Sequence, residues 1–153
     1  MELETLTRPD LIFPDLPGTD GPTVLQALAR KVSEARDLGD SEEIYRRLLE
    51  RERLASTGIG AGVAIPHCKL PKVEEPVLAL GITREPIDFS AIDGEPVRLF
   101  LLILSPEDSP AAHLQALSAV SRWVKEKEPM EALLASPDVQ GITTILAGQP
   151  DGR

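Results

Sequence analysis

One apolar run, Leu99–Leu104, limits the folds that this chain can adopt. A strand with one face toward water alternates apolar and polar residues, whereas this run offers no polar residue to either face. It is also far too short to cross a bilayer as a helix. Extended to Val97–Leu104, the run predicts a strand that is covered on both faces, and two covered faces imply helices on each side of a sheet.

Helical and strand-like segments alternate along the rest of the chain, which predicts an α/β fold. A length of 153 residues with 42% hydrophobic residues suits one domain with one core. Residues 7–22 are rich in proline and glycine, and an edge segment is expected there at Leu11–Phe13. Asp40 followed by Glu43 resembles a capping box. The other predicted elements are helices from Pro22 to Gly39 and from Asp40 to about Leu54, a strand at Val77–Thr83, a turn at Asp93-Gly94, a helix from Ser109-Pro110 to Pro129, and short helices over Met130–Ala135 and from Ser136-Pro137 to Leu146.

The segment Ser56–Leu70 reads STGIGAGVAIPHCKL and is chemically the most informative part of the sequence. Its three alternate glycines leave too little side chain for an ordinary helix, and they allow backbone N–H groups to crowd around a small ligand. The segment is therefore expected to begin as a loop. A short buried strand, Val63–Ile65, should follow and end where Pro66 fixes the backbone and His67 emerges.

The longer segment Arg51–His67, RERLASTGIGAGVAIPH, resembles the phosphoacceptor signature of one protein family. This family is the EIIA type 2 domains of the bacterial sugar phosphotransferase system, which are fructose/mannitol-type IIA domains and their nitrogen-regulatory relatives. The similarity extends more loosely over about residues 3–146. It implies a mixed sheet of about five strands sandwiched between helices, in a single domain over residues 1–153 with its core at about 3–147 and a frayed tail at 148–153.

The resemblance also implies that His67 accepts a phosphoryl group on Nε2, with Nδ1 held by a backbone carbonyl. A histidine suits this chemistry, because its reference pKa near 6.5 leaves a free nitrogen lone pair at neutral pH.

Arg51, in the last turn of a predicted helix, could hold phosphate oxygens with two N–H groups. His113 lies near a predicted helix N-terminus, where an imidazole tends to stay neutral and can offer one N–H. The family carries a second site histidine in a similar helix start. The expected phosphate-binding residues of the loop are Ser56, Thr57, Gly58, Gly60 and Gly62.

Each of these residues also has a purely structural explanation. A histidine after a proline can be a polar surface residue, and His113 on an apolar helix face can be a hydrogen-bonded core residue. Arg51 can be a solvated cation that the helix macrodipole favours. Ser56 and Thr57 can cap the loop, and the glycines can serve tight turns.

Composition excludes several other classes of function. The net charge of −9 argues against a nucleic-acid partner and against an anionic membrane surface. The single cysteine, Cys68, rules out an intramolecular disulfide, and no second cysteine exists to complete a metal site, so neither a metal nor a cofactor is predicted. The start of the chain lacks the order of a secretory signal, which predicts a cytoplasmic protein without direct membrane insertion.

Three functions remain open at this level. In the first, His67 takes a phosphoryl group from the histidine phosphocarrier protein HPr and passes it to the cysteine of a IIB domain during sugar uptake. In the second, the same histidine is charged by HPr, but the readout is binding to a regulated transporter or kinase. The long glycine-rich string and the freestanding domain favour this second, nitrogen-regulatory function. The third is an interaction domain without phosphate transfer.

Overall fold

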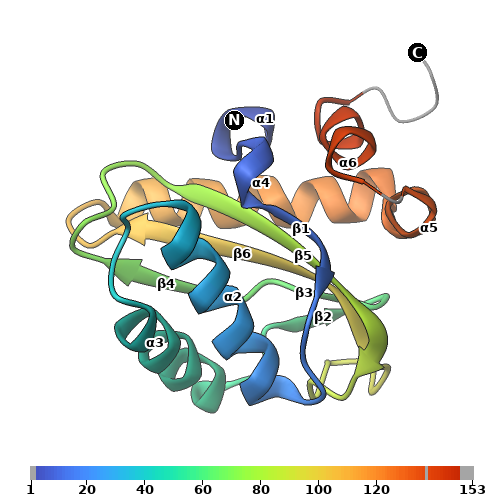
Figure 1. The fold of residues 1–153 in the computed structure, drawn as a ribbon, viewed down its shortest axis with the longest axis horizontal. Coiled ribbons are helices and arrows are strands. Elements are labelled where there is room, and N and C mark those ends of the chain that lie inside the picture. The colour runs from blue at the N-terminus through green and yellow to red at the C-terminus, as the bar shows by residue number, and fades with distance from the viewer. Residues whose placement is uncertain (1–2, 137, 149–153) are drawn as a thin grey trace.

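A mixed six-stranded sheet forms the centre of the fold and carries helices on both faces (Figure 1). The computed structural model describes residues 3–136 and 138–148. Its elements in chain order are α1 (Leu3–Leu6), η1 (Pro9–Leu11), β1 (Ile12–Leu16), α2 (Gly21–Ala35), α3 (Ser41–Leu54), β2 (Gly58–Gly60), β3 (Val63–Ala64), β4 (His67–Leu70), β5 (Val77–Ile87), β6 (Val97–Pro106), α4 (Pro110–Lys127), α5 (Met130–Ala135) and α6 (Val139–Leu146).

The strand predicted from the apolar run is β6, and it lies inside the sheet. The strand order is β1-β5-β6-β3-β2, and β4 also pairs with β6. β5 runs antiparallel to β6, whereas β3 and β4 run parallel to it and β1 runs parallel to β5. Every residue of β6 except Arg98 is buried. The predicted α/β class with a mixed sheet is therefore confirmed, with six strands instead of about five.

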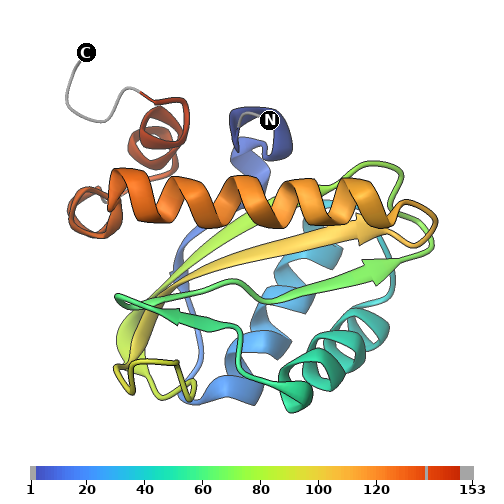
Figure 2. The ribbon, with the colours of Figure 1, turned by 180° about the vertical axis from the view of Figure 1, so that it is seen from behind.

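Alternate residues of β6 supply two separate cores. Phe100, Leu102 and Leu104 pack with the apolar residues of α2 and α3 on one face of the sheet. Leu99, Leu101 and Ile103 pack with α1, α4, α5 and α6 on the other. Figure 1 shows α2 and α3 in front of the sheet, and Figure 2 shows α4 in front of the opposite face. A continuous apolar strand is stable here because helices exclude water from both of its faces.

The N-terminal part of the chain forms the edge strand that was expected, but over a longer stretch. β1 covers Ile12–Leu16 and, among the described strands, pairs only with β5. It contains Pro14, which an edge strand tolerates because a proline cannot donate to a neighbouring strand. The short helices α1 and η1 were not predicted.

Two helix starts differ from the sequence expectation. α2 begins after Asp20, which forms a capping box with Thr23, and it ends at Ala35, short of the predicted Gly39. The capping box predicted at Asp40 is wrong: this residue precedes α3, but its side chain makes no capping hydrogen bond. The Glu43 carboxylate instead accepts from Arg47, four residues further along the helix.

The C-terminal helices follow the prediction closely. α4 ends at Lys127, and Glu128 takes a left-handed conformation after it. α6 starts after Asp138, whose side chain accepts from the Gly141 N–H. The start that was predicted at Ser136-Pro137 involves residue 137, and the predicted frayed tail includes 149–153; both lie outside the described residues.

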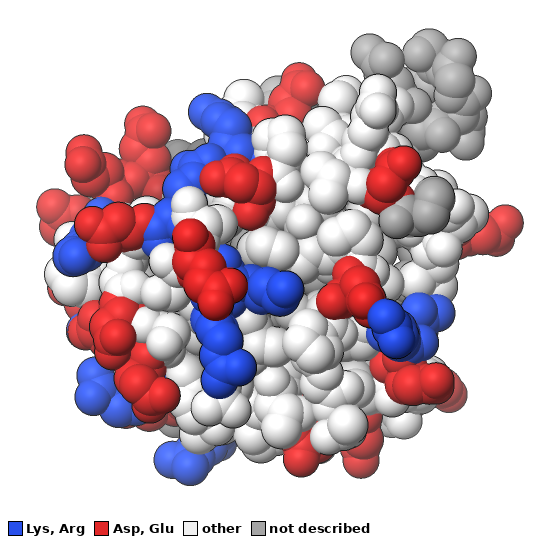
Figure 3. Space-filling model, viewed as in Figure 1, with Lys and Arg blue, Asp and Glu red and all other residues white. Residues whose placement is uncertain are grey.

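Charged side chains are interspersed on the face of the molecule seen in Figure 3, where acidic and basic groups surround a broad uncharged area. This face has no extended basic surface of the kind that nucleic-acid binding needs. None of the helices within residues 3–136 and 138–148 is long and apolar enough to cross a membrane.

Candidate functional site

The glycine-rich segment folds differently from the expected loop. β2 and β3 form a small antiparallel hairpin in which Gly58 lies opposite Ala64. The short strand predicted before Pro66 is present as β3, and His67, which was expected to emerge after it, begins a further strand, β4, where it lies beside Ile103 of β6. Pro66 separates β3 from β4, and its carbonyl accepts from the Ile103 N–H at 2.9 Å. This interruption places His67 on a strand that has β6 as its only neighbour in the described sheet.

Glycines are required in the hairpin for structural reasons. A Cβ on Gly58 would come within 2.8 Å of the Ala91 Cα. Gly60 and Gly62 have φ angles of +101° and +80°, which side chains disfavour. The alternative explanation of these glycines as turn residues therefore fits their geometry.

Ser56 and Thr57 are also occupied by bonds that build the hairpin. The Ser56 hydroxyl donates to the Phe89 carbonyl at 2.7 Å and accepts from the Gly58 N–H. The Thr57 N–H and hydroxyl both donate to the Glu52 carboxylate at 2.7 Å. None of Ser56, Thr57, Gly58, Gly60 and Gly62 lines the pocket that contains His67. Their role in phosphate binding therefore stays a prediction that this geometry does not support.

The pocket beside His67 is an open hollow of about 840 Å³ between α3, β4 and α4. Arg51 enters it from the helix layer on one face of the sheet, and His113 enters it from the layer on the other. Figure 2 shows β4 between these two helices. The residues that line the pocket are Arg46, Arg47, Glu50, Arg51, Leu54, His67, Cys68, Lys69 and His113.

Two hydrogen bonds fix the protonation of the His67 ring. Its Nδ1 lies 2.8 Å from the Ile65 carbonyl oxygen, which can only accept, so Nδ1 carries the proton. The Arg51 Nε–H donates to Nε2 at 3.1 Å, which requires a lone pair on that nitrogen. Burial lowers the pKa of His67 below its usual 6.5; the bond to Ile65 opposes this shift, and the Arg51 charge adds to it. The ring is thus neutral at pH 7, with an unprotonated Nε2 that can act as a nucleophile.

Arg51 is held in place at the end of α3. Its Nη1 donates to the Ala55 carbonyl at 2.9 Å, while its Nε contacts His67. A neighbouring arginine, Arg47, donates to the Lys69 carbonyl and to Glu107, and so ties α3 to β4 and to the loop before α4. The guanidinium of Arg51 is therefore preorganised beside the His67 ring.

His113 lies in the first turns of α4, and its ring centroid is 5.3 Å from that of His67, with the ring planes tilted by 52°. Its side chain is buried, yet the residue borders the pocket. Its Nδ1 lies 2.6 Å from the Ser105 hydroxyl. Burial, followed by the nearby charges of His67, Lys69 and Arg51, lowers the pKa of His113 to about 4. His113 is thus a neutral imidazole at pH 7, as expected from its position.

Sequence reasoning did not identify Ser105 and Lys69 as site residues. Ser105 directly follows the apolar run, and a fully buried polar residue at the end of such a run is a signal that could have singled it out. Lys69 follows His67 by two residues, so both side chains leave β4 on the same side. Together with Arg46, Arg47 and Arg51 it makes the pocket locally basic in an acidic protein, which favours an anionic ligand.

Cys68 faces the core between these two positions and does not supply a nucleophile. The residue is buried, and burial raises the pKa of its thiol to about 12. A thiol in this environment stays protonated at neutral pH. Within residues 3–136 and 138–148, no three His, Cys, Asp or Glu side chains are grouped so that they could hold a metal ion.

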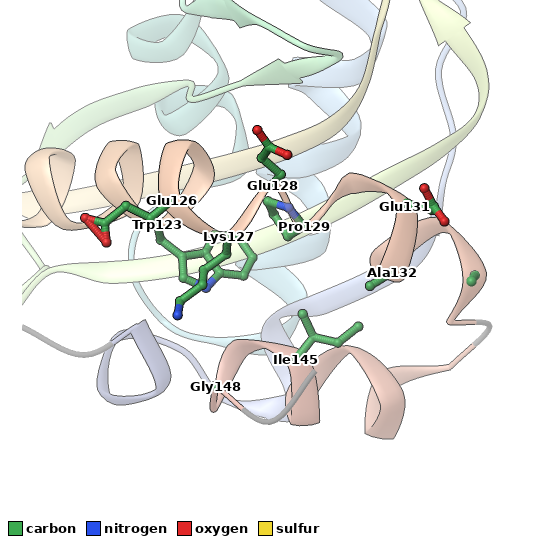
Figure 4. A pocket seen from close by; sticks show the side chains of 10 residues that line it. Trp123, Glu126, Lys127, Glu128, Pro129, Glu131, Ala132, Ile145 and Gly148 are labelled. Carbon is green, nitrogen blue, oxygen red and sulfur yellow. The ribbon is translucent and has the colours of Figure 1, made fainter. Parts of the chain in front are cut away.

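A second cavity, of about 700 Å³, lies between the C-terminal end of α4 and the helices α5 and α6. Figure 4 shows Trp123 and Lys127 on one side of it and Ile145 on another. It contains no histidine or cysteine and none of the residues that surround His67. The chemistry described above is therefore confined to the pocket between α3, β4 and α4.

The burial of both histidines predicts a specific dependence of stability on pH. Since the unfolded chain protonates His113 near pH 6.5 and the folded chain only near pH 4, the unfolded state binds more protons between these values. We expect the unfolding free energy to be highest above about pH 6.5 and to fall as the pH drops toward 4. A histidine whose pKa is lowered this far contributes roughly 3 kcal/mol over the window. Denaturant unfolding of the wild type and of His113→Gln should show a shallower decline in the variant, and equal slopes would contradict the low pKa.

Comparison with known proteins gives consistent matches over nearly the whole chain. Residues 5–148 match the family described as phosphoenolpyruvate-dependent sugar phosphotransferase system, EIIA 2. A nitrogen regulatory protein of Bradyrhizobium diazoefficiens is 40% identical over 98% of this chain and 97% of its own length. A fructose-specific EIIA component of Haloferax volcanii is 34% identical over 95% of each chain. The crystal structure of the nitrogen regulatory protein IIA-Ntr from Neisseria meningitidis superposes with a TM-score of 0.85 at 29% identity, covering 94% of this chain and 98% of that one.

Proposed function

Because the chain belongs to the EIIA 2 family of the phosphoenolpyruvate-dependent sugar phosphotransferase system, we propose that it is a phosphohistidine carrier with His67 as its acceptor. The observation that carries this proposal is the fixed tautomer of His67, which leaves Nε2 unprotonated and directed at Arg51. A carrier needs a nucleophile that is free at neutral pH and whose product can be passed on. The His67 ring meets the first requirement through its two hydrogen bonds, and a phosphoramidate meets the second.

Phosphoryl transfer to His67 exchanges one N–P bond for another. The Nε2 lone pair of His67 forms a bond to the phosphorus of a phosphohistidine donor, and the electron pair of the broken N–P bond remains on the donor nitrogen. Each ring keeps the proton on its other nitrogen, so the protein has to supply no proton. Negative charge on the moving oxygens is balanced by Arg51, Lys69 and an N–H of His113, which all line the pocket. Hydrogen bonds hold Arg51 and His113 in place before the donor arrives.

The donor that the family relationship indicates is the phosphorylated form of HPr. For the acceptor, the 40% identity with a nitrogen regulatory protein favours a regulatory readout, in which the phosphorylation state of His67 controls binding to a transporter or kinase. We place this exchange in the cytoplasm, where such partners would be met. The interaction domain without phosphate transfer finds no support here, because the ring of His67 and its arginine partner are both intact and bonded.

A sugar-specific role is the second candidate, and the similarity to a fructose-specific EIIA component supports it. In this role the phosphoryl group would continue to the cysteine of a IIB domain. The two roles can be separated by mixing the phosphorylated protein with a purified fructose-type IIB domain. Rapid loss of phosphate from His67 supports sugar transport, and a stable phosphoprotein supports the regulatory role.

We expect the wild-type protein to gain one acid-labile phosphate when it is incubated with phosphoenolpyruvate, Enzyme I and HPr. The phosphate should be attached to Nε2, because Nδ1 of His67 carries a proton and donates it in a hydrogen bond to the Ile65 carbonyl. Intact-protein mass spectrometry counts the phosphates, and ³¹P NMR together with ¹⁵N shifts of the labelled histidine identifies the nitrogen. Attachment to Nδ1, or no incorporation at all, would contradict the proposal.

A further inference from the structure

A buried contact between Ser105 and His113 determines where the proton lies on the His113 ring. Ser105 belongs to β6 and has no exposed surface. By alternation it lies on the same face as Ile103, which is the face that α4 covers. Its hydroxyl oxygen is 2.6 Å from Nδ1 of His113. This is a buried side-chain bond between the sheet and the helix that carries the second histidine.

The direction of this hydrogen bond follows from the partners available to the hydroxyl. A serine hydroxyl has one proton to donate, and in a fully buried position that proton needs an acceptor. Among residues 3–136 and 138–148, Nδ1 of His113 is the only side-chain or backbone partner found for the Ser105 hydroxyl. If Nδ1 carried a proton and donated it, the hydroxyl proton would be left without an acceptor in the core. The bond that satisfies both groups therefore runs from Ser105 to a bare Nδ1.

A neutral imidazole with a bare Nδ1 carries its proton on Nε2. The low pKa of His113 is consistent with a neutral ring. Because Nδ1 is turned toward the buried serine, the Nε2 edge of the ring faces the pocket that His113 borders, beside the His67 ring. His67 and His113 are thus held as opposite tautomers: one presents a lone pair to the pocket and the other presents an N–H.

We propose that Ser105 is a positioning residue, which donates its hydroxyl proton to His113 and so keeps the Nε2–H of that ring directed at the phosphoryl group bound at His67. This inference rests on the proposed phosphoryl transfer. It adds that the donor is preorganised from inside the sheet, because a ring fixed at Nδ1 does not have to rotate when the negative charge arrives.

The tautomers can be measured without any transfer reaction. The chain contains two histidines, so a long-range ¹H–¹⁵N correlation spectrum of protein with ¹⁵N-labelled histidine at pH 7 shows two rings, which His113→Gln assigns. We expect His67 as the Nδ1–H form and His113 as the Nε2–H form. A His113 ring with the proton on Nδ1 would overturn the proposal, whatever the outcome of phosphorylation.

A matched pair of variants tests the effect on transfer. Ser105→Thr and Ser105→Val have nearly the same shape and add the same volume to a buried site, but only threonine keeps the hydroxyl. We expect the valine variant to transfer phosphate from phosphorylated HPr about 5- to 10-fold more slowly than the threonine variant, the loss typical of one neutral hydrogen bond. The loss should be in kcat, with KM for HPr unchanged, since Ser105 does not reach the surface.

The ¹⁵N resonance of Nδ1 in His113 should also move in the valine variant and not in the threonine variant. Ser105→Ala removes the hydroxyl without adding volume. It should therefore show the same slower transfer and the same change in the Nδ1 resonance as the valine variant, even if overpacking destabilises the threonine and valine variants. Equal rates and equal Nδ1 shifts in the threonine and valine variants would show that Ser105 is only a packing residue. If the wild type itself took up no phosphate, the proposed function would fail, while the NMR result would still decide the role of Ser105.

Discussion

Replacing His67 with alanine is expected to abolish phosphoryl incorporation, with a loss of at least about 10³-fold in rate, as is usual when a reacting nucleophile is removed. No other group in the pocket can take over. The Cys68 thiol is buried with its pKa raised to about 12, so it stays protonated. The second histidine is the wrong tautomer, because the nitrogen of His113 that faces the pocket carries the proton. Labelling with phosphoenolpyruvate, Enzyme I and HPr, followed by mass spectrometry, measures the effect.

His67→Gln is the structural control for this experiment. Glutamine keeps a polar group of similar reach next to Arg51 and the Ile65 carbonyl, so folding and melting temperature should change little while labelling is lost. His113→Ala serves as the matched second-histidine variant, and it should remain phosphorylatable. Labelling of His67→Ala at the wild-type level would mean that another residue accepts the phosphate and that the histidine of the family signature is not the acceptor in this chain.

The sequence predicted the large elements well, because each of them has a local cause. The apolar run of β6 requires cover on both faces, and the apolar faces of α2, α3 and α4 repeat at helical spacing. The short strands were harder to predict from the sequence. β4 covers only His67–Leu70, and it is a strand because it pairs with β6, more than thirty residues later in the chain. The hairpin of β2 and β3 is built from glycines that have low strand propensity, so it too depends on tertiary pairing.

The candidate site shows the same division. The structure brings His67, Arg51 and His113 together, and each had been singled out by a local feature: the loop end, the last helical turn and the helix start. The sequence predicts a phosphate-binding role for Ser56 and Thr57 because their hydroxyls lie beside the glycines, but in the structure these side chains are hydrogen-bonded to the Phe89 carbonyl and to Glu52. No periodicity in the sequence indicates these partners, because they depend on how the end of α3 meets the hairpin and the loop after β5.

Replacing His113 with alanine is expected to slow phosphoryl transfer by about 10²- to 10³-fold, or about 3 to 4 kcal/mol, the usual effect of losing one preorganised donor to a developing negative charge. The side chain reaches the pocket, its ring lies 5.3 Å from that of His67, and it stays neutral because its pKa is lowered to about 4. His67 keeps its own two hydrogen bonds in this variant, so it should still be phosphorylated slowly. The rate is measured by quenching the reaction with phosphorylated HPr at a series of times and counting the phosphorylated protein by mass spectrometry.

His113→Gln separates this role from simple packing. Glutamine retains an N–H donor near the same position, and we expect it to recover part of the lost rate. A histidine that only packs would behave in the opposite way: both variants would melt at a lower temperature and transfer at nearly the wild-type rate. Both a packing role and a donor role are open to His113, because its ring is buried and also borders the pocket. Burial alone affects unfolding, whereas a donor that contacts the moving phosphoryl group affects kcat. Measuring melting temperature and transfer rate on the same two variants therefore assigns His113 to the core or to the reaction.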